Sequence, residues 1–437
     1  MSWQEDYKSK LCTPEDAIKS IKSGDHVFFG HCVGESQLLV NALVAHAEDY
    51  RDVTIHHMVT LSPGVYTRPE YEKNFRCDLI FCGGGTRGAI ADGRGDYTPC
   101  FFHEYPILIR RGVIPCDALV TMVSPPDEEG YVSLGTSVDY TYQSAKSAKV
   151  IIAHVNDRMP YTYGEKLHVS ELTHIVEASE ELAENPGLKC SEVEEKIGSN
   201  CASLIEDGAT LQLGIGGIPD AVMMFLGDKK DLGIHSEMIA DGTVALFEKG
   251  VITNAKKNFD QGKMVVTFLM GTRKLYDFVD HNPAVEVRPV DYVNHPAVIM
   301  KQHNLISINS AIQVDLQGQV VADSMGLKQF SGVGGQVDFV RGAAMSEDGK
   351  GKAIIAMPSL TIKKDGTRIS KITPLITEGA AITTSRNDVD YVITEYGIAQ
   401  LKGQNLRTRA RRLIDIAHPD FRAELADEFE KRFRQKY

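Results

Sequence analysis

Residues 211–242, LQLGIGGIPDAVMMFLGDKKDLGIHSEMIADG, predict a strand, a glycine loop, a helix and a second short strand in succession. The apolar run Thr210–Leu213 is typical of a buried strand, and it breaks at the glycines of 214–219. Asp220 is predicted to cap the helix, and the second strand leads into Glu237. Because the carboxyl ends of parallel strands meet at one edge of an open α/β sheet, we expect the glycine loop and the Glu237 carboxylate to lie close together.

The same order of elements occurs twice in the chain. Helix, Gly/Asp turn, strand, loop, helix and strand follow one another in residues 13–58 and again in residues 192–237. A second series continues the parallel: the strands expected at 116–123 and 149–155 have counterparts at 305–312 and 389–394. A repeat of this kind indicates a duplicated α/β chain.

This repetition predicts the fold class, two related open α/β domains with largely parallel sheets and the active site in the cleft between them. Residues 1–185 are predicted to form the first domain and residues 186–437 the second, which carries Glu237. A chain of 437 residues suits two hydrophobic cores better than one. Residues 353–362 and 369–376 are expected to pair as a β-hairpin.

Composition argues against several classes of partner. The chain is 43% hydrophobic and 24% charged, with a formal net charge of −12 and no basic run, which disfavours nucleic acid and anionic membranes. No apolar run approaches the roughly 18 residues of a membrane helix, and the polar start lacks a signal-peptide core. The eight cysteines form no C-x-x-C pair, so we expect reduced, mostly buried thiols in a cytoplasmic protein.

Two other patterns do not develop into sites. Gly83-x-Gly85-x-x-Gly88 matches the dinucleotide-binding spacing, but the turn 92–95 follows where a long helix should begin, so NAD binding is not expected. The histidines are scattered, and adjacent His56 and His57 on a strand would point to opposite faces, so no metal site is expected.

A resemblance to a known family rests on five long segments in order: GIGGIPDAV (214–222), LGIHSEMIADG (232–242), TFLMGTRKLYDF (267–278), QFSGVGGQVDFVRGA (329–343) and DYVITEYGIAQLKG (390–403). Together these segments resemble the acetyl-CoA hydrolase/transferase family of class I CoA-transferases, over nearly the whole chain. The resemblance implies CoA-transferase-like domains. It also implies ping-pong transfer of CoA between acetyl-CoA or butyryl-CoA and a carboxylic acid such as 4-hydroxybutyrate.

In similar enzymes the glutamate of the SEM segment is the covalent nucleophile, which here is Glu237. A carboxylate can attack a thioester and form a glutamyl-CoA thioester without a histidine base. Backbone N–H groups of glycine loops could stabilise the oxyanion, and Ile215 and Gly335 are the candidate donors. The predicted site residues are Glu237; the CoA-loop residues Gly214, Ile215, Gly216, Gly217, Ile218, Gly334 and Gly335; and, for the carboxylic acid, His31 and Gln37.

His31 could equally be a structural histidine, and two other functions remain open. An acyl-CoA hydrolase would let water resolve the glutamyl intermediate, and a non-catalytic acyl-CoA-binding protein would tolerate loss of Glu237. The expected ligands are acyl-CoA and short-chain carboxylic acids, with CoA as substrate and no permanently bound cofactor or metal. A homo-oligomer such as a homodimer is expected.

Overall fold

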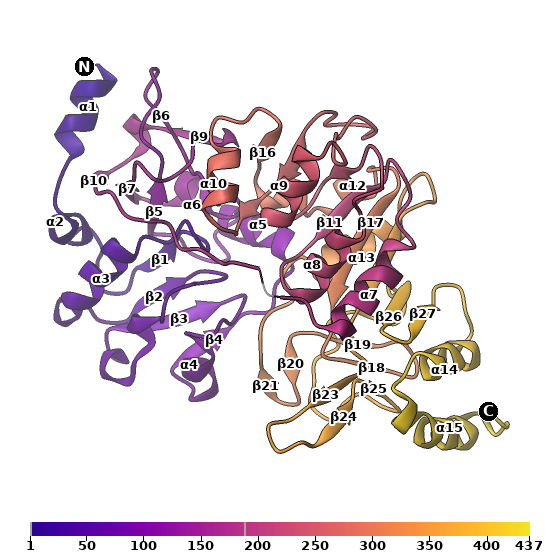
Figure 1. Cartoon of the computed structure of the whole chain (residues 1–437). Coiled ribbons are helices and arrows are strands. Elements are labelled where there is room, and N and C mark those ends of the chain that lie inside the picture. Colours follow the sequence, from indigo (N-terminus) through magenta and orange to yellow (C-terminus); the bar gives the residue numbers. More distant parts are fainter. Residues whose placement is uncertain (1, 188) are drawn as a thin grey trace. The chain divides into compact units, whose positions relative to one another are not determined.

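The computed structural model describes residues 2–187 and 189–437, and the chain divides into two compact units (Figure 1). Unit 1 comprises Met1–Pro186, Lys263–Asn294 and Gln329–Gly334, and unit 2 comprises Gly187–Gly262, His295–Lys328 and Gly335–Tyr437. Among the described residues, no helix combines the length and the apolar composition needed to cross a membrane.

Unit 1 is built on a seven-stranded sheet in which every neighbouring pair is parallel. Its strand order is β10 (His174–Glu177), β7 (Val150–Val155), β5 (Ala118–Val123), β1 (His26–Phe29), β2 (Val53–His56), β3 (Phe75–Leu79) and β4 (Gly95–Tyr97). All six residues of the interior strand β5 are buried, as is typical of a parallel sheet covered on both faces.

The helices of unit 1 contribute buried apolar side chains to its core. They are α1 (Trp3–Lys10), α2 (Pro14–Ile18), α3 (Gln37–Ala45), α4 (Arg87–Ala91), α5 (Tyr105–Arg110), α6 (Thr141–Ser147), α10 (Arg273–Val279) and α11 (Val290–Val293). Thr13 caps α2 as predicted, because its hydroxyl accepts from the Asp16 N–H at 3.2 Å. Leu39 of α3 lies in one buried cluster with Phe29 of β1 and Ile55 of β2.

Unit 2 is built on a six-stranded sheet. Its order is β12 (Gly233–Ile234), β11 (Thr210–Leu213), β17 (Leu305–Ser310), β22 (Lys352–Ala356), β26 (Tyr391–Thr394) and β27 (Gly397–Gln400). The first five strands are parallel and only β27 is antiparallel. The helices are α7 (Glu192–Ala202), α8 (Gly217–Met224), α9 (Asp241–Glu248), α12 (Pro296–Ile299), α13 (Gln336–Ala344), α14 (Leu406–Asp415) and α15 (Pro419–Phe433).

The two sheets share a strand order, which agrees with the predicted duplication. The order is β2-β1-β5-β7-β10 in unit 1 and β12-β11-β17-β22-β26 in unit 2. In each unit, the second of these strands along the chain comes first in the sheet, followed by the first, third, fourth and fifth. The predicted α/β class with largely parallel sheets is therefore confirmed. One predicted correspondence was wrong: the counterpart of β7 is β22, whereas residues 389–394 contain β26, the counterpart of β10.

The strand β22 was also misassigned in the predicted β-hairpin of residues 353–362 and 369–376. The predicted β-hairpin is real but shorter, since only β23 (Leu360–Ile362) and β24 (Arg368–Ser370) pair antiparallel. The apolar run that begins it is β22, which is buried between β17 and β26. A short apolar run fits a hairpin strand and a central parallel strand equally well, so periodicity alone could not assign it.

The units do not follow the sequence order completely. The predicted boundary after residue 185 lies one residue from the first break between units, but residues 263–294 and 329–334 belong to unit 1 rather than to the second half. Residues 263–294 join unit 1 through a three-stranded sheet, in which β16 (Val285–Val287) lies between β14 (Met264–Val266) and β8 (Tyr163–Gly164).

Candidate active site

The carboxyl ends of β11 and β12 bring the glycine loop next to the segment that carries Glu237. The strands are parallel neighbours with Leu211 opposite Ile234. Beyond them, the Ser236 hydroxyl donates to the Leu213 carbonyl at 3.1 Å and accepts from the Leu213 N–H at 3.3 Å. The residue before Glu237 is thus fixed to the residue before the glycine loop. Glu237 itself is partly exposed, between buried Ser236 and buried Met238.

The glycines of the loop have distinct structural roles. Gly216 adopts φ +113°, a conformation that side-chain-bearing residues rarely adopt. At Gly217 a Cβ would lie 2.0 Å from Glu194 Oε1, so the Glu194 side chain of α7 would have to move to make room for it. At Gly214 and Gly216 an added Cβ would meet no described atom within 4 Å, which leaves open space beside the loop backbone. Ile215 is 39% exposed.

The helix after this loop begins earlier than predicted. Gly216, not Asp220, is the N-cap of α8, and the Asp220 N–H already bonds to the Gly216 carbonyl at 3.1 Å. Pro219 is compatible with this start because residues in the first turn need no intrahelical N–H bond. The early start presents the unpaired N–H groups of the first turn directly beside the loop, where they favour negative charge.

The second glycine loop reaches the same edge of the unit 2 sheet. Gly335 is the N-cap of α13, with φ −94°, so no left-handed conformation demands glycine there. The Gln336 side chain donates to the carbonyl of Ser310 at the end of β17 at 2.9 Å. Asn309 of β17 in turn donates to Gln212 of β11 at 3.0 Å. In unit 2, Glu237, the Gly214–Ile218 loop and Gly335 are therefore all attached to the carboxyl ends of three adjacent strands.

Gly334 has a different environment in unit 1. Its φ is +55°, its carbonyl accepts from the Phe102 N–H at 3.2 Å, and a Cβ there would lie 3.5 Å from Met58. Nearby, a Cβ on Gly332 would lie 2.2 Å from the Ile80 carbonyl oxygen. The loop before α13 therefore requires glycine at 332 for close approach and at 334 for its backbone conformation.

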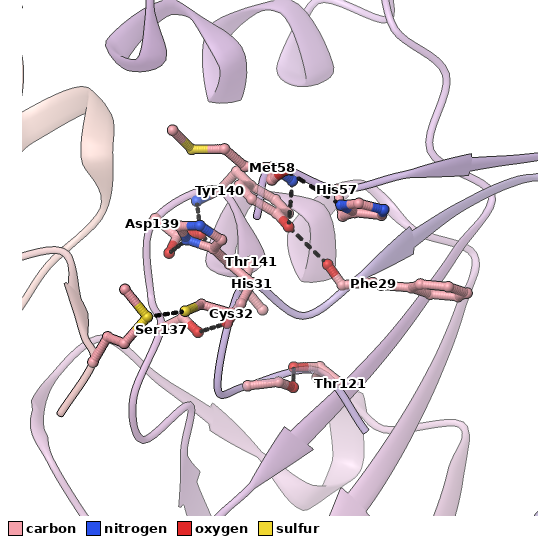
Figure 2. A network of polar contacts seen from close by, with 12 residues as sticks. Phe29, His31, Cys32, His57, Met58, Thr121, Ser137, Asp139, Tyr140 and Thr141 are labelled. Carbon is pink, nitrogen blue, oxygen red and sulfur yellow. Dashed lines mark hydrogen bonds and ion pairs between the residues drawn. The ribbon is translucent and has the colours of Figure 1, made fainter. Parts of the chain in front are cut away.

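His31 does not face solvent. Its side chain is fully buried, and its Nδ1 lies 2.8 Å from Asp139 Oδ2 (Figure 2). Asp139 also accepts from the Tyr140 N–H at 2.7 Å, and the Tyr140 hydroxyl donates to the Phe29 carbonyl at 2.9 Å. The ring packs against Phe268, with centroids 4.5 Å apart. In this structure His31 Nδ1 links β1 to the start of α6, whereas its buried Nε2 has no hydrogen-bond partner among the described residues.

Gln37 has a different hydrogen-bond partner from His31. Its amide donates to Glu35 Oε1 at 2.9 Å, and it is half-buried at the start of α3. The described residues show no hydrogen bond between Gln37 and His31, although both act on Glu35, Gln37 through this bond and His31 through a charge interaction that lowers the Glu35 pKa. Glu35, which was not singled out from the sequence, is only 4% exposed. The only available signal was its position, between a strand end and a helix start in a loop equivalent to the CoA loop.

Comparison with known proteins places these features in one family. The chain matches the acetyl-CoA hydrolase/transferase N-terminal domain over residues 1–184 and the acetyl-CoA hydrolase/transferase C-terminal domain over residues 271–429. A 4-hydroxybutyrate coenzyme A transferase from Clostridium kluyveri is 57% identical over 434 residues, covering 99% of this chain and 100% of the relative.

Two further similarities agree. A succinyl-CoA:cyclohexane-1-carboxylate CoA transferase from Geobacter metallireducens is 44% identical over 98% of this chain and 96% of the relative. The crystal structure of a 4-hydroxybutyrate CoA-transferase from Porphyromonas gingivalis matches with a TM-score of 0.85 at 42% identity, covering 99% of this chain and 100% of that one.

Proposed function

This chain belongs to the acetyl-CoA hydrolase/transferase family, and we propose that it transfers CoA between acetyl-CoA or butyryl-CoA and 4-hydroxybutyrate. It is a CoA-transferase enzyme, and the choice of acids is the proposed part. The observation that carries the mechanism is the double hydrogen bond between Ser236 and Leu213, which fixes the Glu237 segment beside the glycine loop. CoA enters as a substrate, and the proposal includes no permanently bound cofactor.

The reaction begins when a Glu237 carboxylate oxygen attacks the thioester carbonyl. The carbon–sulfur bond breaks, which leaves a mixed anhydride and free CoA thiolate. The thiolate then attacks the glutamyl carbonyl, the first acid departs as a carboxylate, and Glu237 holds CoA as a thioester. The second acid reverses these steps. Each step exchanges one nucleophile for one leaving group, so no proton transfer is needed.

Each attack creates an oxyanion that needs hydrogen-bond donors. The backbone N–H groups of Ile215 and Gly335 are the proposed donors, since both residues precede helix N-termini at one edge of the unit 2 sheet. Removing one donor of this kind typically costs about 2.7–4 kcal/mol of transition-state stabilisation. The helix N-termini would also stabilise the departing thiolate.

The proposed function is tested by incubating the purified protein with acetyl-CoA and a panel of C2–C6 carboxylic acids. Formation of new acyl-CoA is followed together with release of free thiol. We expect exchange with little thiol release, because the glutamyl intermediate is resolved by an acid rather than by water. Thiol release without exchange would identify an acyl-CoA hydrolase, and neither product would leave only acyl-CoA binding.

The order of substrate binding should be ping-pong. The first acid leaves before the second binds, because CoA waits on the enzyme as a covalent thioester. Double-reciprocal plots of rate against acetyl-CoA, at several fixed concentrations of 4-hydroxybutyrate, are expected to be parallel. Intersecting lines would show that both substrates occupy the enzyme together, which the glutamyl-thioester mechanism does not allow.

Substitution of Gly214 by alanine should reduce activity without reducing stability. Gly214 is not in a left-handed conformation, and a Cβ there would meet no described atom within 4 Å, so the fold tolerates it. The methyl group would enter the space proposed for the thioester, and displacement of the reacting atoms by about 1 Å can cost 10²-fold.

Gly227→Ala is the matched control for Gly214→Ala. Gly227 lies in the same unit, also has open space at its Cβ position and is not left-handed. Both variants should melt at the wild-type temperature, and only Gly214→Ala should lose exchange activity. Equal activities of the two variants would remove Gly214 from the site.

A further inference from the structure

The loop after β1 holds a buried carboxyl group with one unused oxygen. Glu35 is 4% exposed, and its Oε1 accepts from Gln37 Nε2 at 2.9 Å and from the Ser62 hydroxyl at 3.1 Å. Its Oε2 is also buried and has no hydrogen-bond partner among the described residues. Leaving a buried polar atom unpaired typically costs about 1–3 kcal/mol, so a partner for Oε2 is expected when the protein is occupied.

Glu35 lines a pocket of about 520 Å³, the Glu35 pocket, which lies entirely within unit 1. Its volume falls within the range of small-molecule sites, roughly 300–1,000 Å³. Much of its wall is apolar, formed by Val33, Leu61, Pro63 and Met122. A buried polar atom in a mostly apolar wall is the arrangement that orients a small ligand.

The charges of the Glu35 pocket limit the ligand further. Besides Glu35, the carboxyl groups of Glu180 and Glu181 line it, and its described lining includes no lysine, arginine or histidine. An anionic group entering the pocket would therefore meet the carboxyl groups of Glu35 and Glu180, whereas the charge of Glu181 is partly offset by Arg158 at 3.5 Å. A neutral polar group avoids this repulsion and the cost of burying an unpaired charge.

A hydroxyl is the neutral group that suits Glu35 in either protonation state. Burial raises the pKa of Glu35, while the hydroxyl and amide groups of Thr60, Gln37 and Ser62 and the nearby His31 lower it in part. A hydroxyl donates to an ionised carboxylate and accepts from a protonated one. A carboxylate ligand could pair only with the protonated form.

We propose that the Glu35 pocket binds the hydroxyalkyl end of a hydroxylated monocarboxylic acid or its acyl group, with Glu35 Oε2 hydrogen-bonded to the substrate hydroxyl. The proposal rests on the function proposed above and extends it to substrate choice. Hydroxy acids are preferred over unsubstituted acids by the hydrogen bond, and dicarboxylates such as succinate are disfavoured by the acidic lining.

The test compares three variants by their ratio of kcat/KM for 4-hydroxybutyrate to that for butyrate. Glu35→Leu removes the hydrogen bond and should lower this ratio about ten- to a hundredfold. Glu35→Gln should largely keep it, because an amide oxygen can accept from Gln37 and Ser62 while the amide N–H takes the place of Oε2. Glu48→Gln, on an exposed glutamate outside the pocket, is the matched control and should leave the ratio unchanged.

Glu35→Leu also removes the acceptor of Gln37 and Ser62, so a second variant guards against failure to fold. Leu61 is 40% exposed and lines the pocket, so Leu61→Trp can fill it with a larger and mostly apolar side chain while leaving Glu35 and its partners in place. Leu61→Trp should fold and should lower the ratio as well. A ratio that stays at the wild-type value in both Glu35→Leu and Leu61→Trp, while exchange with butyrate proceeds, would overturn the pocket assignment and leave the proposed function standing.

A binding measurement without CoA tests the Glu35 pocket assignment independently of the proposed CoA transfer. Wild-type protein is titrated with 4-hydroxybutyrate, butyrate and succinate, and binding is followed by ligand-observed NMR. We expect 4-hydroxybutyrate to bind about tenfold more tightly than butyrate, and succinate to bind most weakly. This order without any CoA exchange would refute only the proposed function, whereas equal binding of all three acids would overturn the pocket assignment.

Discussion

Glu237→Gln is expected to lower CoA exchange by about 10³-fold or more, because the amide cannot form the glutamyl thioester. The side chain keeps its size, and Ser236 still holds the segment to Leu213, so the variant should fold and melt as wild type does. The measurement is the initial rate of acyl-CoA formation from acetyl-CoA and 4-hydroxybutyrate, with thermal unfolding recorded on the same preparations.

Glu237→Asp supplies the matched geometric control. It keeps the charge but withdraws the carboxylate by one methylene, and a displacement of about 1 Å can cost 10²-fold where attack needs close approach. After incubation with acetyl-CoA and digestion, the wild-type peptide 231–249 should carry CoA by mass spectrometry. CoA on a different carboxylate, or wild-type exchange in Glu237→Gln, would show that another residue is the nucleophile.

The sequence predicts the fold well wherever the signal is local. Buried strands such as β11 and β5 are apolar runs, and Thr13 caps its helix through a contact three residues away. The misassigned elements depend on distant partners. The apolar run of β22 predicts a hairpin strand equally well, because nothing in it reveals that it pairs with β17 and β26.

In the candidate site too, residues placed by local sequence were predictable and residues placed by distant contacts were not. The glycine loop and Glu237 follow neighbouring strands, so the strand–helix–strand pattern indicated that they would be close. Glu35 is buried with the help of Ser62, which is 27 residues further along the chain, and no local pattern reveals that contact. His31 occupies a strand-end position that often faces a ligand, yet Asp139, 108 residues away, holds it in the interior.

Asp139→Ala should lower the free energy of unfolding by about 1–3 kcal/mol for each buried donor that it leaves without an acceptor. The change leaves His31 Nδ1 and the Tyr140 N–H without their acceptor in a fully buried position (Figure 2). Urea unfolding followed by circular dichroism measures the loss.

Asp139→Asn is the milder companion, because its amide oxygen can still accept from the Tyr140 N–H, and it should lose less stability than Asp139→Ala. Its KM for 4-hydroxybutyrate tests the role of His31. A structural His31 predicts an unchanged KM in folded Asp139→Asn, since the ring contacts Asp139 and Phe268 rather than solvent. A KM raised tenfold at wild-type stability would instead show that His31 contributes to carboxylic acid binding. The buried position of His31 would then have to open during turnover.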